Sequence, residues 1–139
     1  MYTLRRYNAP GDTASIHKLD HSIFKCGSSK QELEKMLGWV IDEGFSPVGY
    51  LLYTRVDDKN LFLETIGVDP TWRGQGIGTE LMNKIISKAD DQEQNIHLYI
   101  NKQHQGLVKF YELFGFTIKN KTCSKAYTSI AMYRPRVLK

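Results

Sequence analysis

Apolar residues recur along the chain with two different periods, which predict where strands and helices lie. Short runs rich in apolar and aromatic residues predict seven strands, at residues 2–7, 39–43, 48–56, 61–68, 95–100, 116–119 and 127–133. Apolar residues spaced three and four apart predict four helices, which start after a turn at 8–12, at Ser28 or Ser29, at Ile77 and near His104. Because strands and helices interleave, we expect a layered, mixed fold.

For two of these helices, the sequence also predicts where they end and which side chains face inward. The second should end at Gly38, with an inner side formed by Leu33, Met36 and Leu37. The fourth should run from about His104 to Phe114 and close at Gly115. Its inner side should contain Leu107, Phe110, Tyr111 and Phe114.

The connections predict how the strands pair. A Gly-Phe-Ser-Pro turn joins 39–43 to 48–56, and a polar turn at 57–60 joins 48–56 to 61–68, which favours an antiparallel meander. The helix after strand 61–68 is a crossover, so strand 95–100 should run parallel to strand 61–68. The last two strands indicate a hairpin across Asn120 to Ala126. The expected fold class is α/β (α+β), with one domain over 1–139. Its sheet should be mixed, mostly antiparallel and six- to seven-stranded, flanked by about four helices.

Composition narrows the class of protein without deciding its function. The apolar share of 41% and the charged share of 24% are ordinary for a globular domain, and no long uncharged apolar run predicts a membrane span. The first six residues lack the apolar core of a signal peptide, so we expect a cytoplasmic protein. Cys26 and Cys123 lack metal-ligand spacing and are expected to be reduced thiols, and we predict no metal site.

The net charge of +4 suits a polyanionic ligand as well as nucleic acid. Lys and Arg form no compact run apart from the tail, so we do not expect a nucleic-acid partner.

A glycine-rich turn between strand 61–68 and the third helix is the strongest chemical signal. It contains Arg73, Gly74, Gln75, Gly76, Ile77 and Gly78. A helix start offers backbone N–H groups to an anion, glycine lets a phosphate approach closely, and an arginine adds a charged contact. The spacing fits neither the G-x-G-x-x-G dinucleotide motif nor a P-loop, which would end in G-K-S/T. The turn therefore predicts a pyrophosphate site of another kind.

The pattern R-x-x-G-x-G after a strand ending in V-D-P resembles the acyl-CoA-binding signature of the GNAT superfamily of N-acetyltransferases. A second stretch, 98–116, resembles that family's L-x-V-x-x-x-N-x-x-A-x-x-F/L-Y-x-x-x-G-F motif. It departs from the motif at two positions, since His104 stands where the family has Asn and Leu107 where it has a small residue. The resemblance covers about 61–116.

The resemblance implies acetyl-CoA as the acetyl donor and a splayed parallel strand pair at the cofactor site. The fourth strand should carry a bulge, and Ile66, Gly67 and Val68 should hold the pantetheine arm, with a backbone N–H polarising the thioester carbonyl. The residues from Arg73 to Thr79, including Gln75, Ile77 and Gly78, should hold the pyrophosphate. His104 should cap a helix or contact the cofactor, and Tyr111 matches the tyrosine that protonates the departing thiolate.

Acetyl transfer to a primary amine also needs a base, because an amine with a pKa of about 10 is mostly protonated at neutral pH. Glu64 is the candidate, acting through water. It shares a strand face with Phe62, Ile66 and Val68, just before the expected thioester site. The alternatives are that Glu64 merely reaches solvent or a basic neighbour, and that Tyr111 is merely a core aromatic.

Two readings of the whole chain remain open at this point. The first is an N-acetyltransferase whose acceptor is an amine of a protein or of a small molecule. The second is a protein of the same fold that binds acyl-CoA or a partner without catalysis. A homodimer formed through an exposed final strand is also open.

Overall fold

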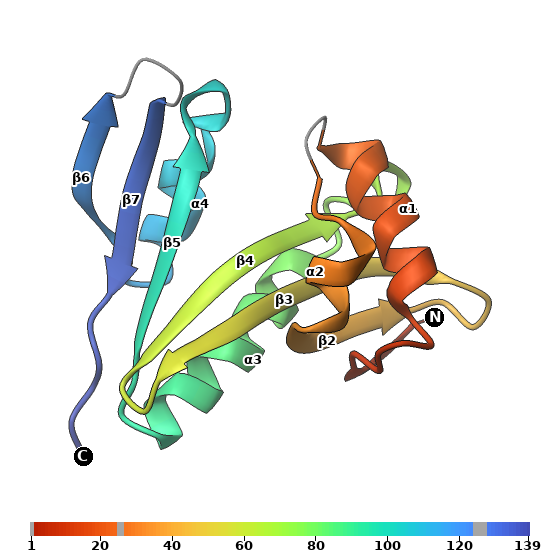
Figure 1. The fold of residues 1–139 in the computed structure, drawn as a ribbon, viewed down its shortest axis with the longest axis horizontal. Coiled ribbons are helices and arrows are strands. Elements are labelled where there is room, and N and C mark those ends of the chain that lie inside the picture. Colours follow the sequence, from red (N-terminus) through yellow and green to blue (C-terminus); the bar gives the residue numbers. More distant parts are fainter. Residues whose placement is uncertain (1, 25–26, 124–127) are drawn as a thin grey trace. The chain divides into compact units, whose positions relative to one another are not determined.

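The computed structural model describes residues 2–24, 27–123 and 128–139. Within them the elements, in chain order, are β1 (Thr3–Arg6), α1 (Thr13–Ile23), α2 (Lys30–Glu34), β2 (Leu37–Asp42), β3 (Pro47–Asp57), β4 (Asn60–Val68), η1 (Pro70–Trp72), α3 (Ile77–Asp91), β5 (Asn95–Asn101), η2 (Lys102–His104), α4 (Leu107–Glu112), β6 (Thr117–Cys123) and β7 (Thr128–Arg134) (Figure 1). Of the helices in these ranges, none has the length and apolar character that crossing a bilayer requires.

The strands form one mixed sheet in the order β1-β2-β3-β4-β5-β7-β6. β1 with β2, β2 with β3, β5 with β7, and β7 with β6 are antiparallel pairs. β4 and β5 are parallel, and their register joins Asn60–Phe62 to Asn95–His97. The predicted mixed, mostly antiparallel sheet with a parallel pair after the crossover helix is therefore confirmed, with seven strands.

The chain forms two compact units, each described here by itself. The first contains Met1–Thr54 and Leu63–Ile86, and the second contains Arg55–Phe62 and Ser87–Lys139.

In the first unit, helices cover both faces of the sheet. Side chains alternate along a strand, so Val40 of β2 and Tyr50 of β3, which are paired, share one face. They belong to a buried cluster with Ile16 of α1 and Leu33 of α2. On the other face, a Cβ added at Gly49 would lie 2.8 Å from Cγ2 of Ile77, so the start of α3 packs directly on β3.

The amphipathic pattern predicted for α3 matches its burial. Its apolar row at helical spacing is fully buried or nearly so, and consists of Ile77, Leu81, Met82, Ile85 and Ala89.

In the second unit, inward side chains alternate along β5 and β7, where Leu98 is paired with Met132 and Ile100 with Ile130. Arg134 joins three elements, because Nε donates to the Phe114 carbonyl at 2.9 Å and Nη1 to Asp90 Oδ1 at 2.8 Å. This side chain holds the ends of β7, α4 and α3 together.

The second helix differs from its expected extent. α2 begins after Ser29, where a capping box with Glu32 satisfies the first-turn N–H groups, but it ends at Glu34. Leu37 is the first residue of β2 and is 52% exposed. Gly38 lies inside the strand, where a Cβ would come 1.9 Å from the Leu51 carbonyl oxygen. Leu37 and Gly38, which the pattern assigned to a helix, therefore belong to a paired strand.

The fourth helix is also shorter than expected. Residues 102–104 form a separate 3-10 turn capped by Asn101, and α4 begins only at Leu107. Leu107 then falls in the first turn and is 39% exposed, so its expected inward position is wrong. Tyr111, one helical turn later, is buried as expected.

The last hairpin differs in its turn and in its place in the sheet. β6 continues to Cys123, beyond the expected start of the turn, and residues 124–127 lie outside the described residues. β7 pairs with β5 on one side and β6 on the other. The final strand is therefore not an edge, and the expected route to a homodimer through it is wrong.

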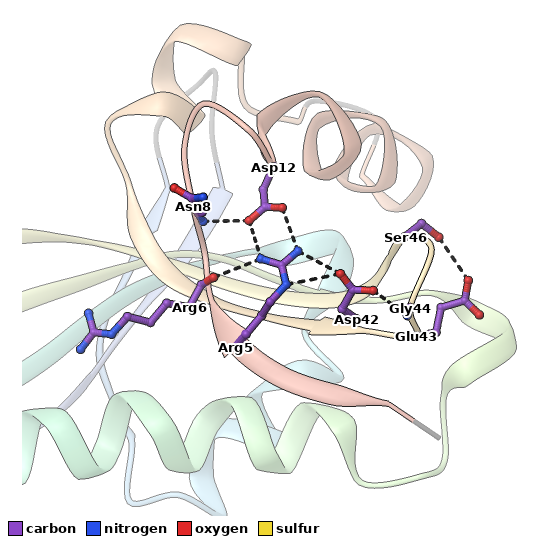
Figure 2. A network of polar contacts seen from close by, with 8 residues as sticks. All are labelled: Arg5, Arg6, Asn8, Asp12, Asp42, Glu43, Gly44 and Ser46. Atoms are coloured by element: carbon purple, nitrogen blue, oxygen red, sulfur yellow. Dashed lines mark hydrogen bonds and ion pairs between the residues drawn. The ribbon is translucent and has the colours of Figure 1, made fainter.

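A charged network around Arg5 fixes the first strand of the first unit (Figure 2). Its Nη1 and Nη2 donate to both oxygens of Asp12 at 2.7 and 2.9 Å, and Nη2 also donates to Asp42 at 2.9 Å. Arg5 lowers the pKa of Asp12, and a bond from the Gly44 N–H, followed by Arg5, lowers that of Asp42. The network joins β1, the turn before α1 and β2.

We predict that Arg5→Gln lowers the free energy of unfolding by about 1–2 kcal/mol at pH 7, since half-exposed charged hydrogen bonds are partly screened. Because both carboxyls have folded-state pKa values below their unfolded ones, their contribution is complete above the usual Asp pKa and disappears as the pH falls through the folded values. Urea unfolding at several pH values measures both effects. Arg6→Gln, which removes the same charge from an exposed side chain, is the control. Equal acid sensitivity of wild type and Arg5→Gln would contradict the prediction.

Candidate functional site

The chain leaves the sheet after β4 through a rigid turn. The Asp69 N–H still pairs with the Val48 carbonyl at 2.8 Å, while Asp69 Oδ1 accepts bonds from the N–H and hydroxyl of Thr71. Trp72 packs edge-on against Tyr2, with ring centroids 6.3 Å apart. These contacts fix the place from which the glycine-rich turn starts.

Two glycines in that turn adopt a backbone conformation that other residues rarely reach. Gly74 and Gly76 both have φ of 81°, and a Cβ at either position would meet nothing within 4 Å. Packing within the protein therefore does not require glycine here, whereas the backbone conformation does. The turn presents an open surface, as a ligand cradle must.

The start of α3 directs N–H groups toward this open turn. The first helical hydrogen bond after the turn runs from the Glu80 N–H to the Gly76 carbonyl at 3.0 Å. The N–H groups of Ile77, Gly78 and Thr79 precede it, and a helix start leaves such groups without intrahelical acceptors. Together with the positive end of the helix dipole, they suit an anion.

The side chains around the turn divide into one anchor and several exposed groups. Ile77 is 1% exposed, so only its backbone can face a ligand. Gln75 and Thr79 are exposed. Arg73 is exposed as well, and its Nε donates to the Val68 carbonyl at 3.1 Å, which leaves its two terminal nitrogens for another acceptor. A pyrophosphate fits these residues.

The β4 residues expected to hold the pantetheine arm lie beyond the three-residue parallel ladder. Ile66 and Val68 are half-buried. Gly67 is buried, and a Cβ there would lie 2.6 Å from the Tyr50 hydroxyl. Position 67 therefore requires glycine, because the Tyr50 hydroxyl leaves no room for a side chain. The bulge that the resemblance implies in β4 stays a prediction.

Glu64 is exposed, although the strand around it is largely apolar. Partial burial, followed by the negative charge of Glu32 on α2, raises the pKa of Glu64. The exposure means that the energetic cost of burying a carboxylate does not by itself demand a function here. Its raised pKa does suit a base, and the charge of Glu32 on α2 is the smaller of the two causes.

His104 and Tyr111 belong to the second unit. His104 is exposed and ends η2, but Asn101 caps that turn and Gly106 precedes α4, so the expected capping role of His104 is wrong. Tyr111 is 5% exposed and packs edge-on against the rings of Phe110 and Phe116. Burial raises its pKa to about 12, so its hydroxyl keeps its proton at neutral pH.

Other tyrosines of the sheet pack within the fold. Tyr50 and Tyr53 are core residues, and Tyr133 stacks on His97 at 6.2 Å. Tyr127 lies outside the described residues. Within the described part of the chain, no group of three His, Cys, Asp or Glu side chains is placed to hold a metal ion.

The structure also reveals a buried group that the sequence pattern did not single out. Asp20 of α1 is 1% exposed and accepts hydrogen bonds from Tyr50 and from Thr65 of β4. A signal for it existed, because Asp20 follows Ile16 by four residues and so lies on the inner stripe of α1.

The fold therefore places an open, glycine-rich helix start directly after a sheet strand, an arrangement that suits an anion such as a pyrophosphate. A model described as "Acetyltransferase (GNAT) family" matches residues 5–116. The chain belongs to this family, which confirms the prediction made from the two motifs.

Relatives and solved structures agree with that assignment. The chain is 31% identical over 64 residues to N-alpha-acetyltransferase 50 of Danio rerio, a match covering 45% of this chain and 38% of that protein. It is 26% identical over 132 residues to mycothiol acetyltransferase of Mycolicibacterium smegmatis, covering 81% and 45%. The chain thus matches less than half the length of these curated relatives.

Among solved structures, Arabidopsis thaliana Naa50 in complex with the bisubstrate analogue CoA-Ac-MVNAL has the same fold. Its TM-score is 0.80 at 18% identity, covering 96% of this chain and 97% of that one.

We predict that Gly76→Asp abolishes measurable binding of acetyl-CoA, a loss of at least about 100-fold, because it places a carboxylate against phosphate in a turn whose N–H groups favour anions. Calorimetric titration measures the affinity. Gly76→Asn, which has the same size and the same tolerance of positive φ, separates charge from backbone strain and should bind far better than Gly76→Asp. Equal affinities for the two variants would contradict an anion site at this turn.

Proposed function

We propose that this chain is an acetyl-CoA-dependent N-acetyltransferase that moves an acetyl group directly to a primary amine. The open glycine turn at the start of α3 is the observation that carries the proposal, and membership of the acetyltransferase family supports it. We propose further that both compact units form one domain, because the family match at 5–116 includes residues of each, and that the protein acts in the cytoplasm.

The donor would be held by residues from both motifs. The backbone from Gly74 to Thr79 and the guanidinium of Arg73 bind the pyrophosphate, while the backbone of Ile66–Val68 binds the pantetheine arm. His104 adds a polar contact to that arm. When bound, acetyl-CoA supplies an activated acetyl thioester. A backbone N–H of β4 would donate a hydrogen bond to the thioester carbonyl oxygen and so stabilise the negative charge on it.

Glu64 removes the proton from the acceptor amine through a water molecule. A base works best when its pKa lies near the operating pH, and the raised pKa of Glu64 moves it in that direction. Its exposure leaves room for the water and the amine.

Tyr111 supplies the proton to the departing thiolate. With a pKa raised to about 12, its hydroxyl carries that proton throughout the neutral range.

For the acceptor we propose the α-amine of a peptide as the first class to test. The support is the peptide-bearing analogue bound to the Naa50 structure and the match to N-alpha-acetyltransferase 50. A small amine is the second class, because the match to mycothiol acetyltransferase covers more of this chain.

The direct test is release of coenzyme A thiol from acetyl-CoA with a panel of short peptides, lysine derivatives and small polyamines. Thiol release that depends on one acceptor class, with an acetylated product of the expected mass, supports the proposal. Donor binding without release for any acceptor would favour the alternative of an acyl-CoA-binding protein without catalysis.

We predict that Glu64→Gln removes the rise of kcat/KM with pH, because an amide cannot accept the amine proton. Glu32→Gln, which preserves the capping box, should shift that rise to lower pH, since the negative charge of Glu32 helps to raise the pKa of Glu64. The pH–rate profiles of the three proteins measure both effects. Superimposable profiles for Glu64→Gln and wild type would exclude Glu64 as the base.

We predict that Tyr111→Phe lowers kcat about 100-fold while the affinity for acetyl-CoA stays within about threefold, because the ring still packs and only the proton donor is lost. Tyr99→Phe, at an exposed tyrosine of the same unit, is the control and should leave kcat unchanged. If Tyr111→Phe turned over as fast as Tyr99→Phe, the residue would be a core aromatic only.

A further inference from the structure

A buried carboxylate joins three parts of the first unit beside the strand proposed to hold the thioester. Oδ1 of Asp20 accepts hydrogen bonds from the Tyr50 hydroxyl at 2.5 Å and from Thr65 Oγ1 at 2.9 Å. Its Oδ2 accepts one from the Ser28 N–H at 3.0 Å. The donors come from β3, from β4 and from the residues leading into α2.

These bonds give the carboxylate a defined position. A group that is 1% exposed must satisfy its oxygens within the protein, and three donors do so here. Burial, followed by the charge of Asp20, raises the pKa of Tyr50, so Tyr50 remains a donor.

On β4, the network holds the backbone on both sides of Ile66. Thr65 is bonded to Asp20 directly. Gly67 lies against the Tyr50 hydroxyl so closely that a Cβ would come within 2.6 Å of it. Ile66 lies between these two fixed points, and Glu64, the proposed base, directly precedes Thr65.

On the helical side, the same carboxylate fixes the entry to α2. A Cβ at Gly27 would lie 2.6 Å from Asp20 Oδ2, and the Ser28 carbonyl lies 3.0 Å from His21 Nε2. Ser29 then caps α2, whose Glu32 acts on the charge of Glu64. The position of α2 relative to the proposed base therefore depends on Asp20.

We infer that Asp20 is a positioning residue for acetyl transfer, which holds the entry to α2 and the Glu64–Gly67 part of β4 in one arrangement around the acceptor amine. The inference rests on the proposed function. Among the described residues, the hydrogen bonds of Asp20 go to Ser28, Tyr50 and Thr65 and not to the turn at 73–79, so loss of Asp20 should disturb the alignment of amine and thioester rather than binding of the donor.

The test compares Asp20→Asn with wild type in three measurements. We expect kcat/KM for the amine to fall on the order of 10- to 100-fold, as for a small misalignment of reacting groups. The affinity for acetyl-CoA and the slow hydrolysis of acetyl-CoA in the absence of amine should both stay within about threefold of wild type. Thr65→Val, which removes one of the three donors with little change of shape, should act in the same direction and less strongly.

Asp42→Asn is the matched control, because it makes the same chemical change in the Arg5 network of the same unit. The inference is overturned if Asp20→Asn reduces the amine rate no more than Asp42→Asn does, or if donor affinity falls in proportion to the amine rate.

Amide hydrogen exchange separates this inference from the proposed function. Asp20→Asn should speed exchange at both 27–29 and 64–67, and Asp42→Asn at neither. Unchanged exchange in Asp20→Asn would overturn the inference even in an active enzyme. Faster exchange in a protein whose wild type acetylates no amine would instead overturn the proposed function, and with it the positioning role.

Discussion

The N–H groups that the start of α3 leaves without intrahelical acceptors are the feature on which the account depends. A helix start favours an anion through these groups and through its dipole, but a side chain next to it would block a ligand as large as a pyrophosphate. Gly74 and Gly76 remove that obstacle, and their positive φ values show that the turn conformation itself requires glycine. Two properties of the turn therefore suit an anion: its backbone conformation, and the lack of side chains at these two positions.

The first unit is packed so that this turn keeps its place. Ile77 anchors the beginning of α3 against Gly49 of β3, and the Asp69 N–H continues the β-sheet bonding to Val48 just past the end of β4. The bond from Arg73 to the Val68 carbonyl joins the turn to the strand that precedes it. On the opposite face, Asp20 performs a similar task for the middle of β4. The strand proposed to carry the thioester is thus held by Asp20 in its middle and by the bonds of Asp69 and Arg73 at its end.

The long elements and the anion turn could be predicted from the sequence because local signals determine them. Fifteen residues of α3 keep one apolar stripe, and the strands around Tyr50 and Leu61 are long apolar runs. The short helices could not be delimited, since pairing of Leu37 with Tyr53 and the separate turn at 102–104 are tertiary and capping effects that a helical period does not contain.

The candidate site divides in the same way. The glycines and Arg73 could be predicted because they belong to one contiguous motif, whose backbone and charge act at a single turn. The environment of Glu64 and the burial of Tyr111 depend on α2 and on neighbouring rings, and the Asp20 network joins residues up to 45 positions apart. Sequence spacing places Asp20 on the inner side of α1, but it does not identify the partners Tyr50 and Thr65.

Titration of the ¹⁵N-labelled protein with coenzyme A, followed by backbone amide chemical shifts, tests the central claim most directly. The account predicts that the amide signals of Gly74, Gly76 and Gly78 move most as the ligand binds. Saturable binding that leaves these three signals in place while others shift would contradict it.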